Sequence, residues 1–425
     1  MEKLSLWRAT ANKENNRSPL VGDVTCDVVI IGAGYTGLSV AYHLQKQNTE
    51  AIILEKHQVG HGGSGRNGGE VLTGYLGSME SWAKKKGMEA AREMWQLSLD
   101  SIDLVESLVK EHNIDCDFTR NGSFFAAYKP QHLDGLKRAQ EFLEKHFDYH
   151  DMEIVEKEHI HDELHTNFYH GGRVDKKAAH FHPLNFALGM AEAVEELGGK
   201  IYGNSPALRV ERSQGRVVVK TKNGSVTAKE IVIATNAYSD DLHPVIKKTI
   251  VPVESIMIAT EPLGEAAVED WIKNNRAVHD TKNLLYYFRR TSDHRLAFGG
   301  SGRAFGKKGK ENRFKELHQG MLSVFPQLKD AKIEYEWGGR VGFTKEMHPY
   351  IGQLADGTYF SFGYGGHGAS ISSMLGKLIA DSILSGEEMD NPLVMKQLKT
   401  IPFHSQHAKA VGVLKFYKQF LDRIS

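Results

Sequence analysis

The chain has 425 residues, of which 40% are hydrophobic and 25% charged, and its 53 Lys and Arg are balanced by 53 Asp and Glu. This length predicts two or three domains with a large core, and the composition excludes a disordered, collagen-like or coiled-coil chain. The zero formal net charge gives no excess of basic residues for a nucleic-acid surface. The counts of 21 His and 42 Gly are unusual and point to where function should be sought.

The start of the chain and its cysteines bear on the compartment. Residues 1–19 contain no apolar segment of a signal peptide, and no run reaches the roughly 18 apolar residues of a membrane span. Cys26 and Cys116 make neither a disulfide framework nor a zinc motif. These features predict a cytoplasmic protein without a membrane span, and they predict no particular oligomeric state.

The first regular pattern along the chain is a strand, a glycine turn and a helix. Val28–Ile31 is continuously apolar, as in a strand buried on both faces of a parallel sheet. Helical spacing follows from about Tyr35 to Gln47, and Ala51–Glu55 reads as a second buried strand. The segment therefore predicts a βαβ unit.

The rest of the chain alternates between helical and strand periodicity. Helices are predicted over 78–111, 131–147, 310–325 and 369–384, and another follows His182-Pro183. Short strands with hairpin turns at Gly215 and Asn223-Gly224 occupy 200–238, and 250–298 is again rich in strands. The short loops predict interleaved domains of the α/β class.

The glycines of the first turn form the pattern GxGxxG at Gly32, Gly34 and Gly37. In such a turn the first glycine permits the tight bend, the second lets the backbone approach a pyrophosphate, and the third lets helix and strand pack closely. The helix N-terminus adds unpaired N–H groups and a positive dipole end. Glu55, at the end of the next strand, can accept hydrogen bonds from a ribose. The pattern predicts a dinucleotide site.

Three further segments bring bare backbone toward a ligand. They are the glycine loop Gly62–Gly69, the strand end Ala234-Thr235-Asn236, and the turn FGYGGHG at 362–368. An NAD site normally needs one such loop, whereas several approaches spread over the chain suit one long ligand. The sequence therefore favours FAD over NAD.

With these segments the chain resembles the amino-acid and amine oxidases of the glycine oxidase/D-amino-acid oxidase superfamily of FAD enzymes, and most of all the gamma-glutamylputrescine oxidases. The resemblance rests on GDVTCDVVIIGAGYTGLSVAYHLQ, ILEKHQVGHGGSGRNGGEVLTGY, IVIATNAYSDDL, WGGRVGFT and FGYGGHGASISSMLGKLIAD. It implies a doubly wound, Rossmann-like FAD-binding domain made of 1–78, 150–245 and 330–400. The α+β substrate domain would be made of 79–149 and 246–329, with a C-terminal helix in 401–425.

The resemblance also implies roles for individual residues. The catalytic candidates are His367, Tyr287 and Arg340. Val210 would contact the adenine through its backbone, and the N-terminus of the last helix would stabilise negative charge on the reduced ring. FAD is expected to be noncovalent, with His61 as an alternative point of attachment. The candidate FAD-binding residues are Gly32, Gly34, Tyr35, Thr36, Gly37, Glu55, Lys56, Ser64, Gly65, Arg66, Asn67, Gly68, Gly69, Val210, Ala234, Thr235, Arg340, Gly363, Gly365, Gly366, His367 and Gly368.

The expected reaction removes a hydride from the carbon next to an amine nitrogen, giving an imine and then an aldehyde, while O₂ is reduced to H₂O₂. The reacting amine must be neutral, so desolvation must lower an alkylamine pKa of about 10.4. Aromatic walls could provide this desolvation. The candidates for such walls are Tyr286, Tyr287, Phe288, Phe362 and Tyr364.

One departure from the sarcosine-type relatives bears on the substrate. Ser370 stands where a basic residue of those relatives binds the substrate carboxylate, and 70–75 contains no arginine. This favours an amine such as gamma-glutamylputrescine, whose carboxylate lies far from the reacting carbon. Arg289, Arg290 or Arg340 could hold that distant carboxylate.

Four other readings stay open. One is a dehydrogenase of the same fold that passes electrons to a quinone or carrier, since no lysine can be placed beside the flavin to promote O₂ reduction. Others are an oxidase of glycine, sarcosine or another amino acid, a nucleotide-binding subunit without turnover, and an NAD-dependent dehydrogenase. Eight of the histidines fall between His146 and His182, and we expect them to lie at the surface or in the core and to bind no metal.

Overall fold

In the computed structural model, which describes residues 4–301 and 309–424, the two strands of the predicted βαβ unit lie side by side in a six-stranded sheet. The order is β19-β20-β13-β2-β3-β9, and every pair is parallel except β19 with β20. The strands are β2 (Val28–Ile31), β3 (Ala51–Leu54), β9 (Lys200–Tyr202), β13 (Glu230–Ile233), β19 (Tyr350–Gln353) and β20 (Thr358–Phe362). The predicted doubly wound sheet is confirmed.

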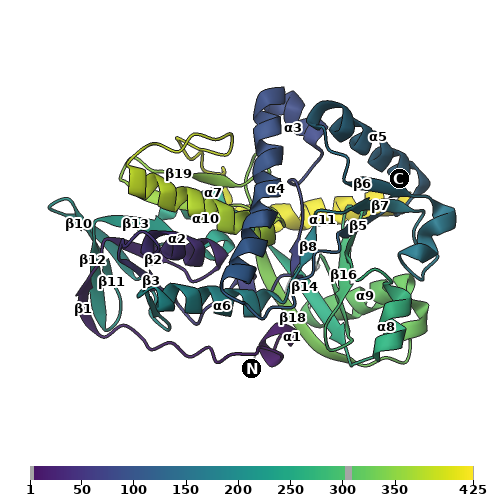
Figure 1. Ribbon diagram of the computed structural model, residues 1–425, viewed down its shortest axis with the longest axis horizontal. Helices are drawn as coiled ribbons and strands as arrows, with labels where there is room; N and C mark the ends of the chain where they lie inside the picture. The colour runs from purple at the N-terminus through teal and green to yellow at the C-terminus, as the bar shows by residue number, and fades with distance from the viewer. Residues whose placement is uncertain (1–3, 302–308, 425) are drawn as a thin grey trace.

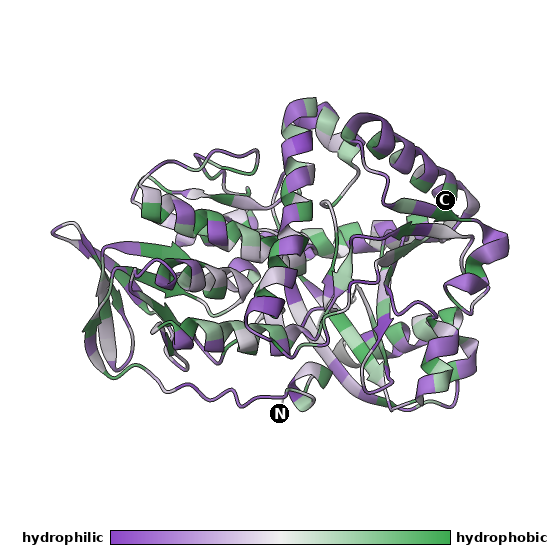
Figure 2. Ribbon diagram, in the orientation of Figure 1, coloured by the Kyte–Doolittle hydropathy of each residue, from purple (hydrophilic) through white to green (hydrophobic). Residues whose placement is uncertain are grey.

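The continuous apolar runs of this sheet are explained by what covers its two faces. Val28 and Ile30 face one core cluster together with helices α2 (Tyr35–Gln45), α6 (Pro183–Glu196) and α10 (Gly368–Ser385). Val29 and Ile31 face another cluster, which includes residues of a four-stranded sheet in the order β1-β12-β11-β10. Figure 2 shows the sheet strands in the hydrophobic colour. The four strands are β1 (Gly22–Thr25), β10 (Arg209–Ser213), β11 (Arg216–Lys220) and β12 (Gly224–Ala228).

An eight-stranded sheet forms the other half of the molecule, on the right in Figure 1, in the order β18-β14-β17-β16-β15-β5-β7-β6. Its strands are β5 (Ser123–Ala126), β6 (Met152–Val155), β7 (Gly172–Asp175), β14 (Val251–Thr260), β15 (Ala277–Asp280), β16 (Tyr286–Arg290), β17 (Leu296–Ser301) and β18 (Ile333–Phe343). A two-stranded pair, β4 (Glu70–Val71) with β8 (Ala179–His180), is separate from the three larger sheets. Strands β6, β7 and β18 fall inside the ranges expected for the FAD domain, and they pair in this second sheet; the domain limits stay a prediction.

The helix predicted over 78–111 is two helices. Gly87 adopts φ +93°, which L-residues rarely adopt, and its N–H closes the first helix on the Ala83 carbonyl at 3.0 Å. The remaining helices are α1 (Leu6–Ala9), α3 (Met79–Lys86), α4 (Met88–Glu111), α5 (Pro130–Phe147), α7 (Pro244–Thr249), α8 (Glu265–Trp271), α9 (Gly309–Val324) and α11 (His407–Ile424). Short 3₁₀ turns occupy Gly63–Gly65, Lys157–Asp162, Asn236–Tyr238, Pro326–Leu328 and His404–Gln406.

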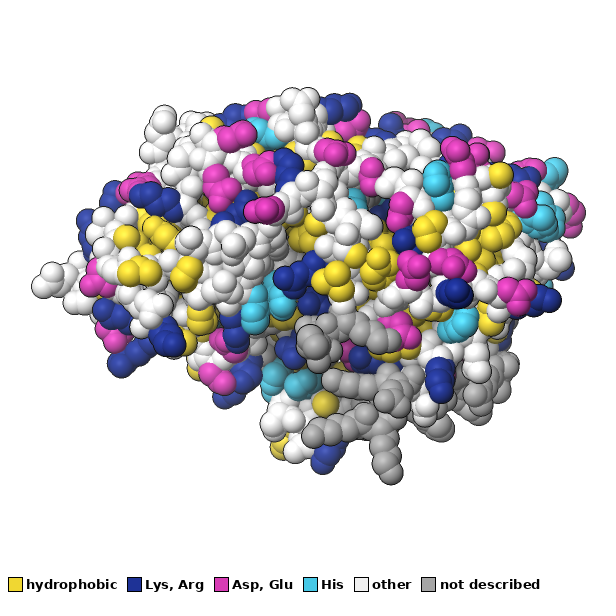
Figure 3. Space-filling view, turned by 90° about the horizontal axis from the view of Figure 1, so that it is seen from below, with side chains coloured by type: hydrophobic (Ala, Val, Ile, Leu, Met, Phe, Trp, Pro, Cys, Tyr) yellow, Lys and Arg dark blue, Asp and Glu magenta, His cyan; other side chains and the backbone are white. Residues whose placement is uncertain are grey.

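Two further observations concern the surface. Figure 3 shows acidic and basic side chains interspersed on the face seen from below, in keeping with the balanced charge of the chain. Among the helices in the described ranges, none is both long enough and apolar enough to cross a bilayer.

Candidate active site

The glycine turn between β2 and α2 has the geometry that its pattern predicts. Gly32 adopts φ +106°, and a Cβ on Gly37 would lie 2.0 Å from the Gly32 carbonyl oxygen. A Cβ on Gly34 would lie 2.8 Å from the Ser64 hydroxyl. Both sides of the turn are therefore closed to side chains, and α2 begins beside bare backbone.

The acid at the end of β3 closes onto this turn. The Glu55 carboxylate accepts the Ala33 N–H at 2.9 Å and the His57 N–H at 2.8 Å. Lys56 is exposed and lies 3.6 Å from the Asp240 carboxylate. The acid thus stands at the carboxyl end of the parallel strands, where this class of sheet binds its ligands.

The strand end Ala234-Thr235-Asn236, which the sequence predicts to lie near the ligand, follows β13 and lies against the same turn. The Ala234 N–H donates to the Ile31 carbonyl at 2.9 Å, and the Ala234 carbonyl lies 3.0 Å from where a Cβ of Gly32 would stand. Thr235 follows directly, and its Cγ2 would lie 3.5 Å from the same Cβ position. Val210 lies elsewhere, in β10 opposite Val219, so its contact with adenine stays a prediction.

The glycine loop at 62–69 is held against the N-terminus of α2. The Ser64 hydroxyl accepts the Tyr35 N–H at 3.1 Å, and the Asn67 amide donates to the Ser64 carbonyl at 3.0 Å. Arg66 donates to the His61 and Gly338 carbonyls at 2.8 and 3.2 Å.

Three glycines of this loop leave no room for a side chain without a shift of their neighbours. A Cβ on Gly65 would lie 2.3 Å from the Gly60 carbonyl oxygen, one on Gly68 would lie 3.0 Å from the Tyr287 ring, and one on Gly69 would lie 2.1 Å from the Phe181 carbonyl oxygen.

The glycine turn at 362–368 also lies at the N-terminus of α2. The Gly363 N–H donates to the Asn236 side chain at 2.9 Å, and the Tyr364 and Thr36 hydroxyls lie 2.5 Å apart, which ties the N-termini of α10 and α2 together. Gly365 donates to the Gly342 carbonyl, and His367 directly precedes α10, which begins at Gly368. A Cβ on Gly366 would meet nothing within 4 Å. Two helix N-termini and several bare backbone segments therefore converge, which fits a long ligand with a pyrophosphate such as FAD.

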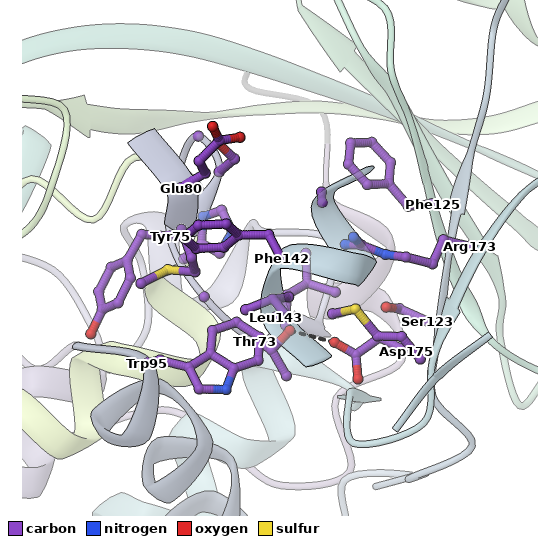
Figure 4. A pocket seen from close by; sticks show the side chains of 18 of the residues that line it. Thr73, Tyr75, Glu80, Trp95, Ser123, Phe125, Phe142, Leu143, Arg173 and Asp175 are labelled. Carbon is purple, nitrogen blue, oxygen red and sulfur yellow. Dashed lines mark hydrogen bonds between the residues drawn. The ribbon is translucent and has the colours of Figure 1, made fainter. Parts of the chain in front are cut away.

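A cavity of about 120 Å³ opens beside these segments, and Figure 4 shows its lining. Its floor comes from β5, β7 and β15 of the eight-stranded sheet, and α3, α4 and α5 contribute to its cover. The aromatic lining is Tyr75, Trp95, Phe125 and Phe142, and none of these belongs to the five aromatic residues expected from the sequence. Phe288 and Phe362 are buried in core clusters and do not line this cavity.

Buried polar atoms without partners lie at the cavity and next to it: His279 and His367 line the cavity, and Glu70 lies beside His279. Glu70 Oε2 lies 3.8 Å from His279 Nδ1, and Glu70 Cγ is 3.7 Å from where a Cβ of Gly68 would stand. Within the described ranges, Glu70 Oε1, His279 Nδ1 and His367 Nδ1 are buried without a hydrogen-bond partner. Burial raises the pKa of Glu70 to about 8 and lowers the pKa of His279 to about 3 and of His367 to about 4.

The three catalytic candidates are not all together. His367 lines the cavity. Tyr287 packs on Gly68, and its hydroxyl lies 2.9 Å from the Ser255 hydroxyl. Arg340 is exposed, with its guanidinium 5.5 Å from the Tyr238 ring centroid, and its carbonyl would lie 3.4 Å from a Cβ on Gly63. Arg340 therefore lies beside the loop and outside the cavity.

The other arginines considered from the sequence are engaged elsewhere. Arg289 donates to the Gly68 and Phe181 carbonyls, each at 2.8 Å, and stacks on the Trp7 ring. Arg290 lies 3.3 Å from the Glu269 carboxylate. The arginine of the cavity lining in the described chain is Arg173, which the sequence analysis missed.

The histidine-rich stretch is dispersed. His159 is exposed and lies 3.3 Å from the Asp162 carboxylate, whereas His180 is buried against the Asn275 carbonyl and His182 caps α6. No group of three potential metal ligands occurs within residues 4–301 and 309–424. His61 stacks on His57 with ring centroids 4.0 Å apart.

This fold and site define a flavin-dependent oxidoreductase, and comparison with known proteins agrees. The FAD dependent oxidoreductase family matches residues 27–382, so the chain belongs to that family. It is 34% identical over 384 residues to the gamma-glutamylputrescine oxidoreductase of Escherichia coli K12, covering 90% of this chain and 89% of that relative.

Solved structures share the fold. Glycine oxidase from Geobacillus kaustophilus superposes with a TM-score of 0.71 at 20% identity, over 86% of this chain and 97% of its own. L-proline dehydrogenase from P. horikoshii gives 0.71 at 21% identity, over 88% and 96%.

Proposed function

We propose that the protein is an oxidase of primary amines that carry a distant carboxylate, with gamma-glutamylputrescine as the best candidate substrate. The overall change is amine plus O₂ plus water to aldehyde, ammonia and H₂O₂. FAD, held noncovalently at the glycine turns around Gly34, Ser64 and Gly363, would supply the hydride acceptor for the carbon next to the nitrogen and the route of the electrons to O₂. The similarity to the Escherichia coli oxidoreductase supports this choice of substrate.

The observation that carries the proposal is the unpartnered Glu70 carboxyl beside the glycine loop. A substrate arrives as an ammonium, and it must lose a proton before its carbon can give up a hydride. Glu70 Oε1 is buried and has a free lone pair, and a carboxyl with a pKa near 8 is a far better proton acceptor than an ordinary glutamate. We assign Glu70 to bind the ammonium and take its proton.

The neighbouring histidines favour the same event. Because burial lowers the pKa of both His279 and His367, they stay neutral at pH 7 and do not repel an arriving cation. The aromatic side chains of the cavity lining would reduce the hydration of a bound amine, which favours its neutral form.

A peroxide assay with purified, FAD-loaded protein tests the function. The panel is gamma-glutamylputrescine, putrescine, spermidine, sarcosine, glycine, pipecolate and D-amino acids. Peroxide should form fastest with gamma-glutamylputrescine. Absence of peroxide with every amine would reject an oxidase, and activity confined to sarcosine or glycine would reject the proposed substrate class.

A dehydrogenase is the second candidate, since the fold is shared with an L-proline dehydrogenase and no lysine lines the cavity in the part of the chain described. Reduction of the enzyme by substrate without air, followed by admission of air, separates the two. Rapid return of the yellow colour supports the oxidase, and return only with a quinone supports the dehydrogenase.

The proposal places the enzyme in the cytosol. Cys26 and Cys116 are both buried free thiols, which suits a reducing compartment.

A further inference from the structure

We propose that Arg173 is the anchor for the substrate carboxylate, and that its distance from the glycine loop selects the length of the substrate. The inference rests on the proposed function for the reacting amine, and it adds the residue that recognises the other end of the molecule. It replaces the three arginines considered from the sequence, which lie in other contacts.

Arg173 has the free hydrogen-bonding capacity that an anchor needs. Figure 4 shows its guanidinium directed into the space between Phe125 and Phe142. Its Nε and Nη1 atoms are buried and have no hydrogen-bond partner among the described residues. A guanidinium remains charged and offers its donors as a planar fork that matches a carboxylate, so buried unused donors point to an anionic ligand.

The acid nearest in sequence does not use these donors. Asp175 lies two residues along β7 and lines the same cavity, as expected for alternate residues of a strand. Its carboxylate already accepts from the Tyr149 hydroxyl at 2.6 Å, the Thr73 hydroxyl at 2.5 Å and the Lys177 N–H at 3.1 Å. The Asp175 charge acts on Arg173 through space, but the Arg173 Nε and Nη1 donors stay unused and available to a bound carboxylate.

Strand register places Arg173 at a fixed distance from the glycine loop. Tyr287, which packs on Gly68, pairs with His279; His279 pairs with Phe125; and Phe125 pairs with Arg173. Paired residues of neighbouring strands point to the same face, so these four side chains form one row. Three strand spacings separate the backbones at the two ends of the row by about 14 Å.

The expected substrate fits this row. In gamma-glutamylputrescine nine bonds join the oxidised carbon to the carboxylate carbon, and an extended chain advances about 1.2 Å per bond, giving about 11 Å. The extended substrate is therefore slightly shorter than the row, which leaves room for a hydrogen bond to the Arg173 side chain. The ring pair of Phe125 and His279, with centroids 4.5 Å apart, lies where the apolar middle of the substrate would pass.

The test compares amines that differ in the carboxylate alone. Glutarylputrescine keeps the carboxylate at the same distance as gamma-glutamylputrescine, and pentanoylputrescine lacks it. Arg173→Met should lower kcat/KM about 10- to 100-fold for gamma-glutamylputrescine and glutarylputrescine, because both lose a charged hydrogen bond to the arginine. For pentanoylputrescine, which has no carboxylate to lose it, kcat/KM should stay within about threefold. Arg173→Lys should recover part of the loss, and Arg92→Met, at an exposed helix position, should change neither. Equal losses on both substrates would overturn the proposal.

The wild-type enzyme supplies a test that requires no variant. Across malonyl-, succinyl-, glutaryl- and adipylputrescine, kcat/KM should peak at glutaryl and fall at least tenfold at malonyl. A flat series would overturn the length selection.

Binding separates this inference from the proposed function. Gamma-glutamylbutylamide, which has no reacting amine, should perturb the flavin absorption of wild-type protein and bind at least tenfold more weakly to Arg173→Met. Binding of this probe without oxidation of any amine would reject the function and keep the anchor, whereas oxidation with unchanged binding in Arg173→Met would reject the anchor alone.

Discussion

Replacing Glu70 by Gln should raise the stability of the protein relative to wild type as the pH increases from 5 to 8.5. In the folded protein burial raises the pKa of this carboxyl from 4.5 to about 8, whereas the unfolded chain has the ordinary value. At 1.36 kcal/mol for each pH unit the rise corresponds to about 5 kcal/mol, an upper bound because the side chain keeps some exposure.

The sign follows from where the proton is held. Below pH 4.5 both states bind it, and the neutral Glu70 contributes its full stability. As pH rises toward 8 the unfolded chain releases the proton and the folded protein keeps it, so this contribution is lost. In the folded protein the groups that face Glu70 do not titrate in this window, because burial lowers the pKa of His279 and His180 to about 3 and of His367 to about 4, and Arg289 stays charged. In the unfolded chain these histidines titrate near 6.5, and their contribution is common to wild type and Glu70→Gln, so it cancels in the comparison.

Urea unfolding of both proteins at pH 5 and pH 8.5, with the same excess of FAD, measures the effect. Glu70→Gln should gain stability relative to wild type by several kcal/mol between the two pH values. It should also lose the limb of the kcat/KM profile that rises near pH 8. A stability difference that does not change with pH would refute the assigned burial and role of this carboxyl.

Three further substitutions have definite expectations. Gly37→Ala should yield colourless protein, because its Cβ would lie 2.0 Å from the Gly32 carbonyl oxygen. The control Gly135→Ala, whose Cβ would meet nothing closer than 3.9 Å, should stay yellow. A Gly37→Ala protein that is yellow and of normal stability would contradict the turn geometry. Tyr287→Phe should lose about 1 kcal/mol of stability with its hydroxyl bond and retain FAD, as unfolding and absorbance would measure; loss of FAD would contradict this. Arg340→Ala should keep kcat/KM within about threefold, because the side chain is exposed outside the cavity; a large loss would return it to the catalytic machinery.

The parts of the fold that could be predicted from sequence are local. The first βαβ unit needs only an apolar run, a glycine pattern and an acid, all within 30 residues, and β2 matches its predicted limits. The break at Gly87 was missed because a glycine inside a periodic pattern is compatible with a continuous helix, and only its positive φ ends α3.

The cavity could not be predicted because strand register creates it. Arg173, Phe125 and His279 come from three strands, and nothing in the chain between them specifies which residues pair. The alternation of Arg173 and Asp175 in a short strand was a usable signal for a polar face. Glu70, which directly follows the glycine loop, was a second signal that was overlooked.

Mixing the FAD-loaded enzyme with gamma-glutamylputrescine in the absence of air tests the central claim most directly. We predict that the visible flavin absorption bleaches completely, that one aldehyde and one ammonia form per flavin, and that admitting air restores the colour with one H₂O₂. A flavin that stays oxidised with this amine and bleaches with glycine or sarcosine would contradict the account.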